Sequence, residues 1–174
     1  MLALEGDVAE VYLQPGESHL ARSPAIIRTI LGSCVGVSLW SAKLGAGALC
    51  HAQLPRCPTP SRVPLSLAVG RRYVDFAIRD LARQFDNLGA ARSEIQVKLF
   101  GGADVLLVTN AASRPTVGRL NCEAAIEVVE AEGFKVTASS LGGTSGLNIQ
   151  FNTKTGEILL RRLHRVLSEE FLDE

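Results

Sequence analysis

The spacing of apolar residues changes once along the chain, and this change restricts the folds that the chain can adopt. Before residue 55, apolar residues alternate with small or polar ones, as in the segment 35–40, and a period of two predicts strands. Residues 55–64 contain four of the seven prolines and are predicted to form a long surface loop. After this loop, apolar residues recur at steps of three and four, which predicts a helix ending at Gly89: Val74, Ala77, Ile78, Leu81, Phe85 and Leu88.

The remaining apolar patterns complete an order of strands, helix, strand, helix and further strands. A second helix is marked by Val117, Leu120, Ala124, Val128 and Ala131. Strands are predicted at 9–13, 25–30, 35–40, 45–54, 95–100, 134–138, 147–152 and 157–163, and residues 168–174 are expected to be a short helix or a frayed tail. Two amphipathic helices can cover only part of this sheet surface, so we predict an α+β sandwich with both helices on one side.

The composition excludes several classes of protein. The 174 residues carry 18 basic and 18 acidic side chains, and this zero net charge disfavours general binding of nucleic acid. Apolar runs stay well short of the ~20 residues of a membrane span, so membrane insertion is not expected. The first residues show no basic region ahead of an apolar stretch, and with four cysteines this predicts a cytoplasmic protein with reduced thiols.

The segment 31–37, Leu-Gly-Ser-Cys-Val-Gly-Val, is the strongest candidate for a site. Gly32 and Gly36 flank the pair Ser33-Cys34 at the start of a predicted strand. Glycine permits close approach of a second molecule, so the Cys34 thiol is expected to be reachable. Backbone N–H groups around Gly32, Ser33 and Cys34 are candidate donors to an oxyanion.

His51 is the candidate partner of this thiol. If Trp40 pairs with Gly45 in a hairpin, Cys34 lies opposite His51, with Cβ atoms ~5 Å apart. At that distance an imidazole is expected to form an ion pair with the thiol and to lower the thiol pKa. A slip of one residue would place the two side chains on opposite faces.

Several alternatives remain at this point. A buried cysteine is more often inert than catalytic. A zinc site from Cys34, Cys50, His51 and Cys57 lacks the short Cys-x₂₋₄-Cys spacing of structural sites, so no metal is predicted. The glycines at 101–102 and 142–146 lack the lysine of a phosphate loop, and we interpret them as turns that bring backbone close to the active pocket.

The Gly-Ser-Cys-Val segment with His51 resembles the chemoreceptor glutamine deamidase family, CheD. Further matches follow in order at 98–103 (KLFGGA), 117–121 (VGRLN), 141–143 (LGG) and 155–158 (TGEI). The resemblance covers residues 8–163, so we expect a single domain over 1–174 with a C-terminal extension at 164–174. It implies a three-layer α/β/β sandwich with its two main helices packed on one side of the sheets.

The resemblance also implies an activity. Members hydrolyse the side-chain amides of particular glutamines on methyl-accepting chemotaxis receptors to glutamate and ammonia, through a thioester. The nucleophile maps onto Cys34, the histidine onto His51, and a threonine just upstream onto Thr29, although some members hold that threonine at the place of Arg28. This chemistry needs no metal or organic cofactor.

The chain departs from the family pattern at a few places. Ser140 and Leu147 stand where members often have aspartate and arginine, and Leu120 separates Arg119 from Asn121. These departures bear on substrate recognition more than on chemistry. Two other hypotheses stay open. The first is a regulatory module that binds a CheC-type phosphatase or the receptor with little or no catalysis. The second is a thiol amidase that acts on another protein.

Overall fold

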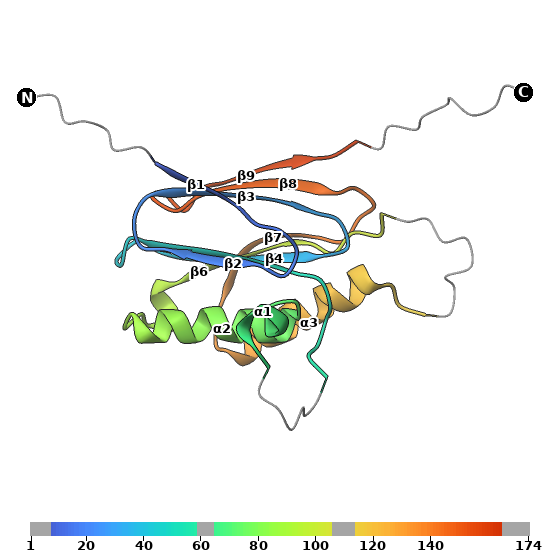
Figure 1. Cartoon of the computed structure of the whole chain (residues 1–174), viewed down its shortest axis with the longest axis horizontal. Coiled ribbons are helices and arrows are strands. Elements are labelled where there is room, and N and C mark those ends of the chain that lie inside the picture. The colour runs from blue at the N-terminus through green and yellow to red at the C-terminus, as the bar shows by residue number, and fades with distance from the viewer. Residues whose placement is uncertain (1–7, 59–64, 106–113, 165–174) are drawn as a thin grey trace, which may run out of the picture.

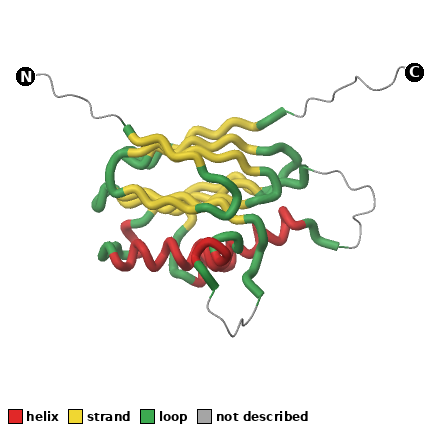
Figure 2. Tube along the Cα trace, viewed as in Figure 1, coloured by secondary structure: helices red, strands yellow, loops and turns green. Residues whose placement is uncertain are grey.

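Two β-sheets are stacked face to face, and the helices lie against the outer face of one of them (Figure 1). The computed structural model describes residues 8–58, 65–105 and 114–164. Figure 2 shows the two strand layers above the helices. The layer between the sheets and the layer between sheet and helices each hold an apolar cluster.

The four-stranded sheet exposes one of its faces. Its strand order is β1 (Ala9–Tyr12), β3 (Ala25–Leu31), β8 (Leu147–Asn152) and β9 (Ile158–Arg162). In β3 the residues Ile27, Thr29 and Leu31 are buried, whereas Arg28 and Ile30 between them are exposed. This alternation follows from the period of two along a strand, which sends one set of side chains to the interior and the other to solvent.

The central strands of the five-stranded sheet are covered on both faces. Its order is β2 (Ser18–Ala21), β5 (Ala46–Ala52), β4 (Val35–Ser41), β6 (Gln96–Gly101) and β7 (Val136–Leu141). Every residue of β5 is buried, and in β4 only Trp40 is partly exposed. Small and apolar residues therefore occupy both faces of these central strands, because neither face meets water.

The helices pack on the five-stranded sheet. They are α1 (Leu67–Gly70), α2 (Val74–Asn87) and α3 (Val117–Ala131), with the 3₁₀ turn η1 (Arg92–Glu94). The predicted apolar face of α2 is confirmed, since Val74, Ala77, Ile78, Leu81 and Phe85 are all buried.

The predicted face of α3 is partly wrong. Val117 is 46% exposed, whereas Gly118 and Asn121 are buried with Ala124 and Val128. A Cβ on Gly118 would lie 2.7 Å from the carbonyl oxygens of Gly102 and Ala103. The loop after β6 therefore touches α3 at Gly118. As a result the buried face of α3 includes Gly118 in place of Val117.

The mixed α+β class with two sheets is confirmed. The sequence missed β2 and α1, because Ser18–Ala21 shows no apolar alternation and a four-residue helix is too short to show a period. Among the described helices none is both long and apolar enough to cross a membrane. Residues 168–174, expected to be a short helix or a frayed tail, and residues 59–64 at the end of the proline-rich loop fall outside the described residues.

The predicted register of the first hairpin is wrong by two residues. Trp40 pairs with Gly47 rather than Gly45, and Gly36 rather than Cys34 lies opposite His51. The reason is that Gly45 belongs to the turn, where it adopts a φ of +58° and donates to the carbonyl of Ala42. A shift by an even number of residues keeps each side chain on its predicted face.

Candidate active site

Three of the predicted site residues converge at one end of the layer between the sheets. Thr29 lies on β3 in the four-stranded sheet, and His51 lies on β5 in the five-stranded sheet. Cys34 sits in the turn that carries the chain from β3 to β4, and its side chain packs against the apolar cluster between the sheets. Because Cys34 is two residues before Gly36, the partner of His51, it is a diagonal neighbour of the histidine.

The ring of His51 is fixed by the opposite sheet. Its Nδ1 lies 2.7 Å from Oγ1 of Thr29, and that hydroxyl donates its only proton to the carbonyl of Leu13 at 2.9 Å. The hydroxyl must therefore accept from Nδ1–H, which leaves Nε2 as the unprotonated ring nitrogen. Nε2 is buried and has no hydrogen-bond partner among the described residues.

Burial keeps both the histidine and the thiol neutral. It lowers the pKa of His51 to about 4, although the carbonyl of Leu13 and the charge of Glu17 favour the protonated ring. Burial also raises the pKa of the Cys34 thiol, against a smaller lowering by the backbone N–H of Cys34 itself. The expectation of a resting ion pair with a lowered thiol pKa is therefore wrong, because desolvation penalises both charged forms.

The backbone around Cys34 is held by its carbonyl groups. The carbonyl of Gly32 accepts from Ala103 N at 2.9 Å, and that of Cys34 accepts from Gly102 N at 2.8 Å. Within the described residues, the amides of Ser33 and Cys34 donate no backbone hydrogen bond. The backbone N–H of Cys34 lowers the pKa of its own thiol, against the larger effect of burial.

The glycines at 101–102 make this arrangement sterically allowed. A Cβ on Gly101 would lie 2.2 Å from the carbonyl oxygen of Cys34, and a Cβ on Gly102 would lie 2.1 Å from Sγ of Cys122. Both have positive φ, +96° and +66°, which residues with a Cβ rarely adopt. The predicted turn at 101–102 is present, and it brings backbone close to Cys34.

The other three cysteines lie elsewhere, and all four are free. Cys50 belongs to the cluster on the helix side of β5, whereas His51 next to it bonds across to the opposite sheet. These two side chains point in opposite directions, so they cannot share a metal ion. The described part of the chain holds no group of three or more side chains able to bind a metal.

A cavity of about 750 Å³ opens beside residues whose backbone is hydrogen-bonded to His51. It is lined by the loop after β1, including Leu13, Gly16 and Glu17, and by Arg71 and Arg72 at the end of α1. The loop is joined to β5 because Gly16 N donates to the carbonyl of His51 and His51 N donates to that of Glu17. This cavity was not predicted from the sequence, because its walls come from separate segments.

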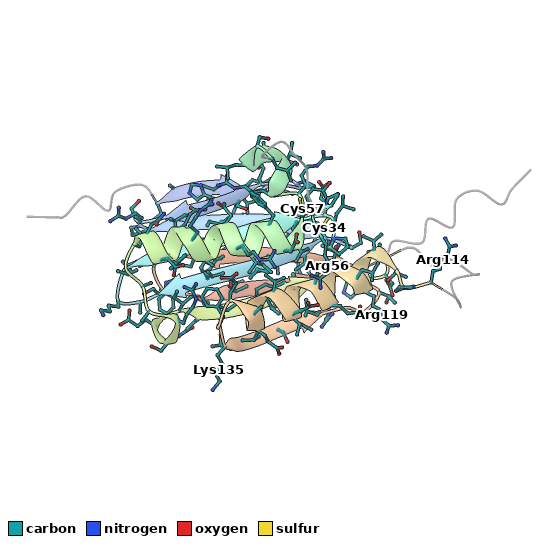
Figure 3. The ribbon with its side chains drawn as sticks, turned by 90° about the horizontal axis from the view of Figure 1, so that it is seen from below. Cys34, Arg56, Cys57, Arg114, Arg119 and Lys135 are labelled. Carbon is teal, nitrogen blue, oxygen red and sulfur yellow. The ribbon has the colours of Figure 1, made fainter. Side chains whose placement is uncertain are left out.

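The residues that depart from the family pattern have separate places. Leu147 is buried between the sheets opposite Leu31, where an arginine would lack water. Ser140 lies on β7, where it is paired with Phe100 of β6, and its Oγ accepts from Nη2 of Arg162 at 3.5 Å. Seen from the helix side, Cys34 lies toward the end of the sheets from which Arg119 of α3 projects (Figure 3).

Asn121 belongs to this region but was not among the predicted site residues. It is fully buried on α3, and its Nδ2 donates to the carbonyls of Ser33 and Gln53 at 2.9 and 3.0 Å. The available signal was a polar residue four positions after Val117 and three before Ala124, at the spacing of the buried stripe.

The fold and this site define a mixed α+β domain in which two stacked sheets bring a cysteine, a histidine and a threonine to one end. The family model described as CheD chemotactic sensory transduction matches residues 64–162. The chain belongs to the CheD family.

Individual relatives match almost the whole chain. The probable chemoreceptor glutamine deamidase CheD 2 of Geobacter sulfurreducens is 42% identical over 95% of this chain and 97% of that protein. The probable chemoreceptor glutamine deamidase CheD of Maridesulfovibrio salexigens is 35% identical over 92% and 96%. That of Rhodospirillum rubrum is 34% identical over 90% and 84%. These alignments are long enough to include the segment with Cys34 and His51, which precedes the part matched by the family model.

Proposed function

We propose that this protein hydrolyses the side-chain amides of specific glutamines on methyl-accepting chemotaxis receptors, with Cys34 as nucleophile and His51 as general base. The observation that carries the proposal is the buried, unpartnered Nε2 of His51, held in the basic tautomer by Thr29 beside the Cys34 turn. Its relatives are named as probable chemoreceptor glutamine deamidases, which supplies the substrate class.

The reaction follows from the two neutral groups. His51 Nε2 takes the thiol proton as Cys34 Sγ attacks the carboxamide carbon of the glutamine, and the carbonyl oxygen becomes an oxyanion. The amides of Ser33 and Cys34, with Gly32 shaping the turn, donate to that oxygen; one such donor contributes about 3 kcal/mol in other enzymes. The carbon–nitrogen bond then breaks, and His51 returns the proton to the departing ammonia.

Hydrolysis of the thioester completes the cycle. Water attacks the thioester carbon and gives a proton to His51, the carbon–sulfur bond breaks, and Cys34 recovers its proton. Glutamate is released. Thr29 acts throughout by keeping Nδ1 protonated, so that Nε2 stays available as a base.

Further parts of the proposal concern organisation. Residues 1–174 form one domain with the α/β/β layer order that the family resemblance implies, and the protein acts in the cytoplasm.

The buried histidine favours catalysis over the alternative of a regulatory module that only binds a CheC-type phosphatase or the receptor, because an unpaired buried nitrogen is costly without a use.

Ammonia release from a receptor cytoplasmic fragment tests the proposal. We expect release by the wild-type protein, with a mass gain of about one dalton at defined glutamines, and none from Cys34→Ala. Cys57→Ala, which removes another half-buried thiol, is the matched control and should keep the activity. Activity on a fragment whose target glutamines are replaced by asparagine would point to a general thiol amidase. No release from any receptor by reduced wild-type protein would favour the binding module.

A further inference from the structure

The pairing between β4 and β5, the strand that carries His51, starts just after Cys34 and does not include the nucleophile. The ladder between β4 and β5 ends at the pair Val35 and Ala52. The next pair along the same register would be Cys34 with Gln53, but the structure has no strand pairing there. A side chain from the helix layer occupies this place.

That side chain is Asn121 of α3. Its amide nitrogen donates one hydrogen bond to the carbonyl of Ser33 at 2.9 Å and another to that of Gln53 at 3.0 Å. Two carbonyl acceptors require the NH₂ group at this position, so the orientation of the amide is settled by its partners. Asn121 thus bridges the residue before Cys34 and the segment that follows His51.

The bridge fixes the direction of one peptide group. In a planar trans peptide the C=O and the following N–H point in opposite directions. Because the carbonyl of Ser33 is held toward α3, the N–H of Cys34 is turned away from the helix layer. That N–H is the one that stabilises the Cys34 thiolate and donates no backbone hydrogen bond within the described residues.

We propose that Asn121 is a positioning residue for the deamidation. Asn121 sets the direction of the Cys34 amide and the separation of the Cys34 turn from the end of β5. This inference rests on the proposed function. Nδ2 of Asn121 contacts the two carbonyls, whereas Oδ1 of the same side chain is buried without a partner among the described residues. A purely structural position would favour an apolar residue here, since an unpaired buried oxygen costs stability.

The test compares Asn121→Ala with Val128→Ala, a buried residue of the same helix that lies outside these contacts. Deamidation of a receptor fragment and thermal unfolding are measured for both. We expect kcat to fall by about 10- to 1,000-fold in Asn121→Ala with KM nearly unchanged, as for loss of an oxyanion donor. Val128→Ala should lose stability but keep kcat. If Asn121→Ala does not fold, Asn121→Ser, which retains one donor, replaces it and should show a smaller fall in kcat.

A second readout separates this inference from the proposed function. The rate at which iodoacetamide alkylates Cys34 is followed against pH by peptide mapping, which needs no substrate. Loss of the oriented N–H should shift the alkylation profile of Asn121→Ala to higher pH than that of the wild type and of Val128→Ala. The inference is overturned if Asn121→Ala matches Val128→Ala in both kcat and alkylation profile. Absence of ammonia release by the wild type would overturn the proposed function, and the alkylation comparison would then decide only whether Asn121 sets the direction of the Cys34 amide.

Discussion

The two ends of the layer between the sheets are both joined by polar side chains, but they differ in whether every polar atom has a partner. At the end near Ala25, Trp40 Nε1 donates across the sheets to the carbonyl of Thr153 at 2.8 Å, and Thr153 Oγ1 accepts from Ala25 N at 2.9 Å. At the other end, His51 and Thr29 bond across the sheets, and Nε2 of His51 has no partner among the described residues. The first end is built for stability, whereas the second gives up stability for a usable base.

The same contrast holds for charge. Lys98 Nζ donates to the carbonyl of Gly156 at 2.9 Å, so the cation near the Trp40 end has a hydrogen-bond acceptor. The histidine is buried enough that its pKa falls to about 4. Replacing residues at the two ends should therefore separate stability from activity.

The largest expected effect is that of His51→Leu on activity. Removal of the base should lower kcat for ammonia release by about 10²- to 10⁴-fold. The unfolding free energy should stay the same or rise, because a buried unpaired nitrogen is replaced by an apolar side chain and Thr29 keeps its bond to Leu13. Chemical denaturation and the ammonia assay measure both quantities. A large loss of stability with retained activity would show that His51 is a structural residue.

The pH dependence of stability is the next effect. The unfolded chain binds a proton at His51 near its ordinary pKa, whereas the folded protein binds it only near pH 4. The contribution of the neutral His51 ring to the free energy of unfolding is therefore complete above the unfolded pKa of 6.5. It is lost as pH falls toward 4, and this loss is about 3 kcal/mol. Urea unfolding at a series of pH values should show this slope in the wild type and a smaller one in His51→Leu. Equal slopes in the two proteins would mean that His51 is not buried as a neutral ring.

A smaller effect on activity is expected from Thr29→Val. Without the hydroxyl, Nδ1–H loses its acceptor and the ring its orientation, so kcat should fall by about 10- to 100-fold, the range for groups that orient a histidine. Thr29→Ser retains the hydroxyl and should remain close to the wild type. Steady-state kinetics on the receptor fragment compare the two variants. If both variants behave alike, the hydroxyl of Thr29 does not serve the histidine.

The smallest effect is expected at the opposite end of the layer. Thr153→Val keeps the shape of the side chain but leaves the amide of Ala25 without its acceptor. This should lower the unfolding free energy by about 1–3 kcal/mol and leave kcat unchanged. Thermal unfolding and the ammonia assay check the pair of results. A fall in kcat at temperatures where the variant is folded would show that the two ends of the layer are coupled.

Several elements and site residues could be predicted because they depend on local pattern. The period of α2 is an amphipathic repeat that burial against a sheet requires, and five of its six predicted residues are buried, while Leu88 is partly buried just after the helix. The face of His51 was predicted correctly although the register was not, since side-chain direction depends only on parity along the strand. The turn at Gly101–Gly102 was recognisable because paired glycines permit close backbone contact.

Other features were hidden because their partners are distant in sequence or lie in the backbone. The acceptor of the Thr29 proton is the carbonyl of Leu13, and a backbone carbonyl carries no residue-specific signal. Asn121 contacts carbonyls 88 and 68 positions away, which only the packing of α3 against the sheet brings within reach. The buried face of α3 depends on Gly118 meeting the loop after β6, so its helical period alone did not determine it.

The sequence by itself determined the period of its elements, the mixed class of the fold, and the resemblance of its Gly-Ser-Cys-Val and histidine segments to the CheD family. Tertiary structure decided the protonation state of the site and the direction of its backbone donors. The physical reason is that a pKa depends on desolvation by residues from both sheets, and a peptide direction depends on hydrogen bonds from another layer. Neither quantity is a property of the segment that carries the reacting groups.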